Sequence, residues 1–342
     1  MQTVSGIIRA RLRSVRPFLT ARLILAAPRQ LAFRGACLCG ALALTVIAAG
    51  CRKSSSAESS IVVFNAGALA LPIRQALDSF APSRGVSVSQ ESAGSVETVR
   101  KIIDLGRIPD IVAVADTALF SHMMPGRITG PVAILGSSHL VLAYTGKSRF
   151  ADMVNAKNWT DVTTRPGVEV GRSDPALDPA GYRALMAMQL AERFYGQPGL
   201  EKRLEAAAST KNMRPKSADL VALLQTGNLD YAWEYESVAR RLGLRFVVLP
   251  PEVDLGDPAL AATYATARVE IPASGAAGSG PNRAPLVMVG APIVFGAGVP
   301  KDAPHPETAR AFITYLMSAP GRSILDSYGL VRAQPSTAAE TK

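Results

Sequence analysis

The chain has 342 residues, of which 48% are hydrophobic and 19% are charged. This length favours about two domains, and the composition is that of a globular protein with ample material for a hydrophobic core. The net charge of +10 resembles that of nucleic-acid-binding proteins, but seven Arg lie within residues 1–50, which contain no Asp or Glu. The rest of the chain carries only +3, which argues against a nucleic-acid partner.

Residues 1–50 have the pattern of an export signal of the lipoprotein type. An Arg-rich stretch precedes the apolar run 36–50, which is too short and too rich in Gly and Ala for a membrane span of about 20 apolar residues. The run ends at the sequence AAGC (48–51), which resembles a bacterial lipobox with Ala48 in place of the usual Leu. The unusually long basic segment is compatible with a true start downstream of Met1.

Cys51 is the residue that we expect to carry the lipid. The other two cysteines, Cys37 and Cys39, would leave with the leader, and a large core makes a disulfide-free exported protein acceptable. Residues 51–60 are polar and Ser-rich, which predicts a flexible tether. The sequence therefore predicts a lipid-anchored protein in the periplasm or on the outer surface of the cytoplasmic membrane. A single-pass anchor with an uncleaved leader is the alternative.

From residue 61 the chain alternates between strand and helix patterns. The elements expected in the first stretch are strands at 61–64, 86–90, 111–114 and 140–144, and helices at 72–80 and 96–103. This alternation predicts βαβ units around a mainly parallel sheet. The turn at 65–68, directly after the first strand, contains Gly67.

The character of the chain changes after residue 144. The expected elements are helices at 179–195, 217–225 and 236–242, a strand at 230–235 and a loop at 272–285, then a strand at 292–295 and a helix at 306–318 that ends at Pro320-Gly321. We predict an α/β fold of two lobes, each a mainly parallel sheet flanked by helices, with a ligand cleft between them. Residues 61–143 and 286–335 would form lobe I, and residues 144–285 would form lobe II.

Small or polar residues follow strands at four places, where ligands of open α/β sheets bind. At the first, Gly67 allows a ligand to approach the backbone amides closely. At the second, Ser95 is a candidate N-cap, whose hydroxyl and the following amides would form an anion site. A plain cap with solvent above it is the alternative for Ser95.

The other two places each contain an acidic residue. Asp178 precedes Pro179, a strong helix start, so capping alone would explain this acid. In the strand at 230–235, alternation puts Glu234 on the face opposite the aromatic residues. A lone glutamate at such a position is most often a solvated charge, so the local patterns by themselves assign neither acid a role in binding.

Catalytic motifs are missing from the sequence. The three histidines, His122, His139 and His305, have no metal-ligand spacing, and there is no nucleophile elbow, P-loop or dinucleotide fingerprint. We therefore expect neither enzyme activity nor a cofactor. A secreted hydrolase or oxidoreductase on an α/β scaffold is the rival class.

Five segments resemble the tungstate/molybdate-binding proteins of archaeal-type ABC importers. They are FNAGALALP (64–72), ESAGSVETVRKIIDLGRIPDIVAVAD (91–116), DPALDPAGYRALMAMQLAERFYG (174–196), LDYAWEYESVA (229–239) and LPPEVDLGDP (249–258). The match covers most of residues 61–335 in the right order. The resemblance implies a monomer with the periplasmic-binding-protein fold, whose lobes close on a tetrahedral oxyanion and deliver it to an ABC permease and its ATPase.

The resemblance also implies which residues contact the ligand. Asp178 and Glu234 match acids whose oxygens approach the bound metal and complete a distorted octahedron. The positions implied to hold the oxo groups are Gly67, Ala68, Gly94, Ser95, Ala180 and Tyr235. Relatives usually have Ser where this chain has Ala68, so a hydroxyl donor is lost. A binder of sulfate, thiosulfate or phosphate with the same fold therefore stays open as the alternative.

Two carboxylates beside a dianion favour a heavy oxyanion. Each close pair of like charges costs about 4 kcal/mol at ~4 Å with an effective dielectric constant near ~20. Sulfate and phosphate add no carboxylate to their central atom, whereas W(VI) and Mo(VI) prefer oxygen ligands and expand their coordination. Asp178 and Glu234 are thus predicted to reject sulfate through uncompensated repulsion.

Overall fold

The computed structural model describes residues 60–273 and 284–332. The expected leader (1–50), Cys51, the tether apart from Ser60, and most of the expected loop at 272–285 lie outside the described residues. Across 60–273 and 284–332, none of the helices combines the length and the apolar character needed to cross a bilayer.

The first sheet has five strands in the order β2-β1-β3-β12-β4. They are β1 (Ser60–Ala66), β2 (Ser87–Ala93), β3 (Ile111–Val114), β4 (Ile128–Ser137) and β12 (Val294–Pro300). β1 pairs in parallel with β2 and β3, while β12 lies antiparallel to both β3 and β4. β12 lies far along the chain from β1–β4, so this lobe contains two separate stretches of the described residues.

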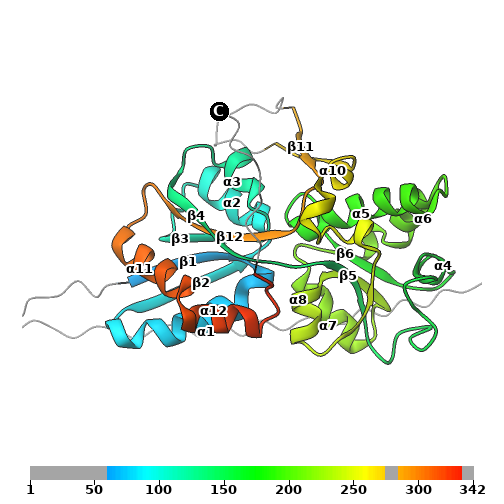
Figure 1. Cartoon of the computed structure of the whole chain (residues 1–342), viewed down its shortest axis with the longest axis horizontal. Coiled ribbons are helices and arrows are strands. Elements are labelled where there is room, and N and C mark those ends of the chain that lie inside the picture. The colour runs from blue at the N-terminus through cyan, green and yellow to red at the C-terminus, as the bar shows by residue number, and fades with distance from the viewer. Residues whose placement is uncertain (1–59, 274–283, 333–342) are drawn as a thin grey trace, which may run out of the picture. The chain divides into compact units, whose positions relative to one another are not determined.

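Helices cover both faces of the first sheet (Figure 1). One face carries α2 (Ser95–Ile103) and α3 (Ala118–Met123), and the other carries α1 (Ala70–Phe80), α11 (Pro306–Met317) and α12 (Ala319–Ser327). The helix predicted from residue 306 to about 318 is confirmed by α11, but Pro320-Gly321 is not its stop signal, because these residues lie in the first turn of the next helix, α12. Proline is tolerated there, since the first turn has no intrahelical partner for its missing N–H.

The second sheet has the order β7-β6-β8-β5-β9. Its strands are β5 (Leu140–Tyr144), β6 (Val170–Ser173), β7 (Met213–Arg214), β8 (Tyr231–Tyr235) and β9 (Arg245–Val248). β6 is parallel to β7 and β8, whereas β5 is antiparallel to β8 and β9. In each sheet one strand runs against four others, so the prediction of two mainly parallel α/β lobes is confirmed.

The helices around the second sheet include those that carry the candidate site. They are α4 (Trp159–Thr163), α5 (Pro179–Tyr195), α6 (Leu200–Ala207), α7 (Ala218–Thr226), α8 (Glu236–Arg241), α9 (Pro251–Asp254) and α10 (Ala261–Tyr264). The described residues also form short 3-10 helices, η1 (Gly67–Leu69) and η2 (Pro82–Arg84) in lobe I and η3 (Thr210–Asn212) and η4 (Pro258–Leu260) in lobe II. β10 (Arg268–Ile271) and β11 (Leu286–Val289) form a separate antiparallel pair, with β10 packed on α5.

The chain crosses between the two sheets at residues 138–139 and again at 290–293. β5 therefore belongs to lobe II, although residues up to 143 were expected in lobe I. The apolar run at 140–144 suits the interior of either sheet, and its pairing with β8 depends on residues far along the chain. The return to lobe I likewise follows β11, later than the expected boundary at residue 286.

Candidate functional site

The N-terminus of α2 in lobe I lies directly against the segment that precedes α5 in lobe II. The Glu97 N–H donates a hydrogen bond to the Leu177 carbonyl oxygen, at 3.0 Å. A Cβ added at Gly94 would lie 2.3 Å from that oxygen and 3.1 Å from the Cβ of Asp178. Only glycine permits this approach. Gly94 and Asp178, predicted from two distant segments, therefore meet at the contact between the lobes.

Ser95 is completely buried beside this contact. The N-cap of α2 is Gly94, so the prediction of Ser95 as the N-cap is wrong by one residue. The Ser95 Oγ accepts a hydrogen bond from the Ala115 N–H, at 2.9 Å. Its burial also excludes the alternative of a plain cap with solvent above it.

Asp178 occupies the N-cap position of α5, with Pro179 as the first helical residue. Its side chain makes no capping hydrogen bond, and Oδ2 instead accepts from the Ser217 N–H at 2.7 Å. Burial raises the pKa of Asp178 to about 6, against the opposing effect of the Ser217 hydrogen bond. Capping alone therefore does not explain this acid.

Glu234 is completely buried at the end of β8, so a solvated charge is excluded. Its Oε1 accepts from the Ser217 hydroxyl at 2.9 Å and from the Tyr235 N–H at 2.8 Å. Its Oε2 has no hydrogen-bond partner among the described residues. Burial raises the pKa of Glu234 to about 8, and the nearby Asp178 acts in the same direction. An unpaired buried oxygen is unfavourable, and a ligand that bonds to it would remove this penalty.

Ser217 joins the two acids and was missed as a site residue by the sequence analysis. Its N–H contacts Asp178 and its hydroxyl contacts Glu234. Ser217 precedes α7 as its N-cap, and a serine before a helix is a recognisable sequence signal. That signal predicts a cap, however, and not a bridge between acids from two other segments.

Gly67 and Ala68 begin η1, immediately after β1. A Cβ added at Gly67 would lie 3.2 Å from the Lys216 Cδ and 3.5 Å from the Ala218 Cβ. A cavity of ≈ 150 Å³ lies between this turn and lobe II, with Ala68 and Ala218 in its lining. The turn thus faces the start of α7, next to Ser217, and Ala68 adds a methyl group where a serine would add a hydroxyl.

Ala180 and Tyr235 also lie close to the acids. Ala180 is buried in the first turn of α5, two residues after Asp178. The Tyr235 hydroxyl accepts a hydrogen bond from the Arg183 Nη1, at 2.9 Å. A hydroxyl that accepts keeps its own proton for donation. The eight residues predicted to contact the ligand are therefore brought to one contact zone between the lobes.

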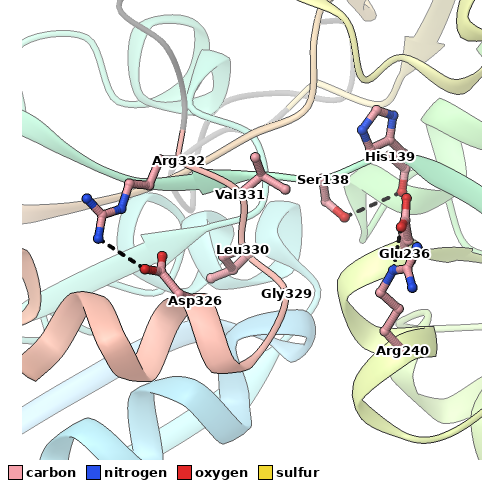
Figure 2. Close-up of a pocket in the computed structure, with 9 residues that line it drawn as sticks. All are labelled: Ser138, His139, Glu236, Arg240, Asp326, Gly329, Leu330, Val331 and Arg332. Atoms are coloured by element: carbon pink, nitrogen blue, oxygen red, sulfur yellow. Dashed lines mark hydrogen bonds and ion pairs between the residues drawn. The ribbon is translucent and has the colours of Figure 1, made fainter.

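A larger cavity, of ≈ 320 Å³, lies at the crossing between the lobes and is separate from the acids. Figure 2 shows Ser138 and His139 of the crossing, with Glu236 and Arg240 on one side and the segment 326–332 on the other. The charged groups on each side are already paired within their own lobe, Arg240 with Glu236 and Arg332 with Asp326. Neither Asp178 nor Glu234 lines this cavity.

Comparisons with known proteins agree with this architecture. Residues 61–331 match the family described as bacterial extracellular solute-binding protein. An uncharacterized solute-binding protein of Petrotoga mobilis is 38% identical over 81% of this chain and 83% of its own length. The molybdate/tungstate-binding protein WtpA of Pyrococcus abyssi is 33% identical, over 83% and 89% respectively, which confirms the resemblance found in the sequence.

Among solved structures, the sulfate-binding protein SubI of Mycobacterium tuberculosis has a similar fold. The TM-score is 0.58 at 15% identity, and the match covers 82% of this chain and 89% of SubI. At this level of identity the likeness concerns the fold alone.

Proposed function

The chain belongs to the bacterial extracellular solute-binding proteins, and from this premise we propose that it captures tungstate or molybdate and delivers the oxyanion to an ABC permease and its ATPase. The observation that carries the proposal is the pair of buried acids joined by Ser217, with Glu234 Oε2 left unpartnered. The name of the relative from Pyrococcus abyssi supports the same ligand class.

Asp178 and Glu234 would bond to the metal centre of the oxyanion. Bringing two carboxylates to a dianion is repulsive unless a cationic centre accepts their oxygens. W(VI) and Mo(VI) provide such a centre, because both expand their coordination with oxygen ligands. Burial raises the pKa values of both acids, although the nearby Arg183 acts in the opposite direction on Asp178, so a metal centre that accepts their oxygens would offset the cost of burying two carboxylates.

The oxo groups would be held by backbone and hydroxyl donors from both lobes. From lobe I these are Gly67, Ala68, Gly94 and Ser95, and from lobe II Ala180 and Tyr235. The amides at the starts of α2 and α5 suit an anion, because a helix N-terminus has unpaired N–H groups and a partial positive charge. A ligand that contacts both lobes favours their closed arrangement. In this role the protein acts as a monomer, with neither catalysis nor a cofactor.

A competition experiment on the purified protein tests the ligand class. We expect tungstate and molybdate to bind at least ~100-fold more tightly than sulfate, thiosulfate or phosphate, equivalent to about 2.7 kcal/mol. Isothermal titration calorimetry with each oxyanion measures this, and native mass spectrometry identifies the anion that is retained. Sulfate or phosphate bound as tightly as tungstate would contradict the proposal. That outcome would favour the alternative oxyanion, to which the missing hydroxyl at Ala68 already points.

We also propose that the protein is exported and held at the outer surface of the cytoplasmic membrane by a lipid on Cys51. The basis is the leader pattern of residues 1–50 and the lipobox-like sequence that ends at Cys51. Labelled palmitate is expected to be incorporated into the wild-type protein in cells and to be lost in Cys51→Ser. Equal labelling of the two proteins would contradict this anchor.

A further inference from the structure

A buried ion pair joins the two lobes next to the candidate site. Asp116 follows β3 in lobe I, and its Oδ2 accepts from the Tyr182 hydroxyl at 2.5 Å and lies 3.1 Å from the Arg183 Nη2. Tyr182 and Arg183 belong to α5 in lobe II. The other oxygen of Asp116, Oδ1, accepts from the Ala118 N–H at 3.0 Å and so fixes the start of α3. One carboxylate is therefore anchored in lobe I and held by two consecutive residues of lobe II.

Arg183 makes contacts in both lobes at once. Only 2% of this residue is exposed. Besides Asp116, its Nη1 donates to the Ala115 carbonyl oxygen at 2.7 Å in lobe I and to the Tyr235 hydroxyl at 2.9 Å in lobe II. A planar guanidinium presents several donors in a fixed geometry, so these contacts define one relative position of the lobes.

The partners of Arg183 lead directly to residues proposed to hold the oxyanion. The Ala115 backbone accepts from Arg183 through its carbonyl oxygen and donates through its N–H to the Ser95 Oγ. Tyr235 accepts from Arg183 through its hydroxyl and donates through its N–H to Glu234. Among the described residues, no hydrogen bond or ion pair joins Arg183 directly to Ser95 or Glu234, but the Ala115 backbone and Tyr235 connect it to both.

We propose that Arg183 and Asp116 form a latch between the lobes, and that Arg183 is a positioning residue which holds Ser95 and Glu234 in their ligand-binding arrangement when the lobes close. This inference rests on the proposed capture of a solute by lobe closure. It does not depend on which oxyanion is bound.

Burial explains why the latch selects one closed arrangement. When the lobes separate, water can solvate Arg183 and Asp116, whereas in the closed arrangement only 3% of the Arg183 side chain and 14% of the Asp116 side chain are exposed. Closure is then favourable only if each charge finds its partners, because a buried charge without a partner is strongly destabilising. A closed state in which one lobe is displaced relative to the other would leave the Arg183 guanidinium without its partners Asp116 and the Ala115 carbonyl oxygen.

Hydrogen exchange and binding kinetics test the latch with Arg183→Gln and Asp116→Asn, one change in each lobe. Arg149→Gln is the matched control, since Arg149 pairs with Asp230 at 2.9 Å within lobe II alone. In the absence of ligand, the Glu97 amide reports closure, because its hydrogen bond to Leu177 joins the lobes. We expect this amide to exchange about tenfold faster in both latch variants than in the wild type or the control.

Tungstate is expected to dissociate about tenfold faster from both latch variants, with little change in the association rate. The double variant should lose less affinity than the sum of the losses in the single variants, because both changes break the contact between Arg183 and Asp116. Tyr182→Phe removes one hydrogen bond to Asp116 and should have a smaller effect in the same direction. If Arg183→Gln does not fold, this variant and Asp116→Asn still test the latch.

Wild-type exchange at Glu97 in both Asp116→Asn and Tyr182→Phe would overturn the latch, as would additive losses of affinity in the double variant. The exchange measurement uses no ligand, so it tests the latch even if tungstate fails to bind the wild-type protein. Amides of β8, within the core of lobe II, should keep their wild-type exchange and exclude general unfolding.

Discussion

Glu234→Gln is expected to weaken tungstate binding on the order of 100-fold, and Asp178→Asn to have a similar effect. Each amide has nearly the shape of the carboxylate it replaces, so the hydrogen bonds from Ser217 have an oxygen acceptor in both variants. What is lost is the negative oxygen that bonds to the metal centre. Competitive titration of tungstate and molybdate against each variant measures the loss.

Glu236→Gln is the matched control for these variants. Glu236 lies two residues after Glu234, but its carboxylate pairs with Arg240 and lines the cavity at the crossing between the lobes. We expect its affinity for tungstate to stay within about twofold of the wild type, since exposed ion pairs contribute little. Wild-type affinity in both Glu234→Gln and Asp178→Asn would exclude a bond between these acids and the metal centre. An equal loss in Glu236→Gln would point to an effect of net charge.

Local signals in the sequence predicted several elements with their correct bounds. The helix at 179–195 is the clearest case, because Asp178 and Pro179 mark its start and Gly196 marks its end. Gly196 has a φ of +58°, a left-handed conformation that glycine adopts at helix ends without strain. The strand at 111–114 was equally readable, since a short apolar run is typical of a fully buried strand.

Contacts between distant segments could not be predicted in this way. Ser217 meets Asp178 and Glu234 only because three strand ends of lobe II converge, and nothing near residue 217 in the sequence encodes those partners. The same holds for Arg183, whose position in the second turn of α5 suggests an ordinary helix residue. The strand at 140–144 was assigned to the wrong lobe for a related reason, since the choice of sheet depends on which strand it pairs with.

Tungstate binding is expected to release about one proton near pH 7. Burial raises the pKa of Glu234 to about 8, so this acid is mostly neutral at that pH, whereas Asp178, with a pKa of about 6, is mostly ionised. A bond to the metal centre requires the carboxylate form of Glu234. The affinity should therefore rise about tenfold per pH unit between pH 6 and 8 and level off above that. Calorimetry in buffers of different ionisation enthalpy counts the released proton.

The pH dependence of the stability of the ligand-free protein provides an independent measurement of the pKa of Glu234. The pKa of Glu234 is raised above the value of about 4.3 of an unfolded chain. Between these two values the folded state binds more protons, so the free energy of unfolding falls by about 1.4 kcal/mol per pH unit as the pH rises. The contribution of Glu234 to this fall should be absent from Glu234→Gln, whereas Asp178, whose pKa is raised to about 6, still lowers the stability up to about that pH in both proteins. His139, whose pKa is raised by its hydrogen bond to Asp254, also favours the folded state at low pH, but it acts equally in both proteins and cancels in their difference.

The direction of proton transfer on binding separates the two classes of ligand. A carboxylate that bonds to W(VI) or Mo(VI) gives up its proton, whereas an acid that donates a hydrogen bond to an oxo group of sulfate keeps its proton or gains one. Glu234→Gln should abolish the release, because the amide has no proton to lose in this range. Uptake of a proton with tungstate in the wild-type protein would contradict a metal–carboxylate bond. In that case the neutral form of Glu234 would be the one that binds, and the two buried acids would act as hydrogen-bond donors to the anion.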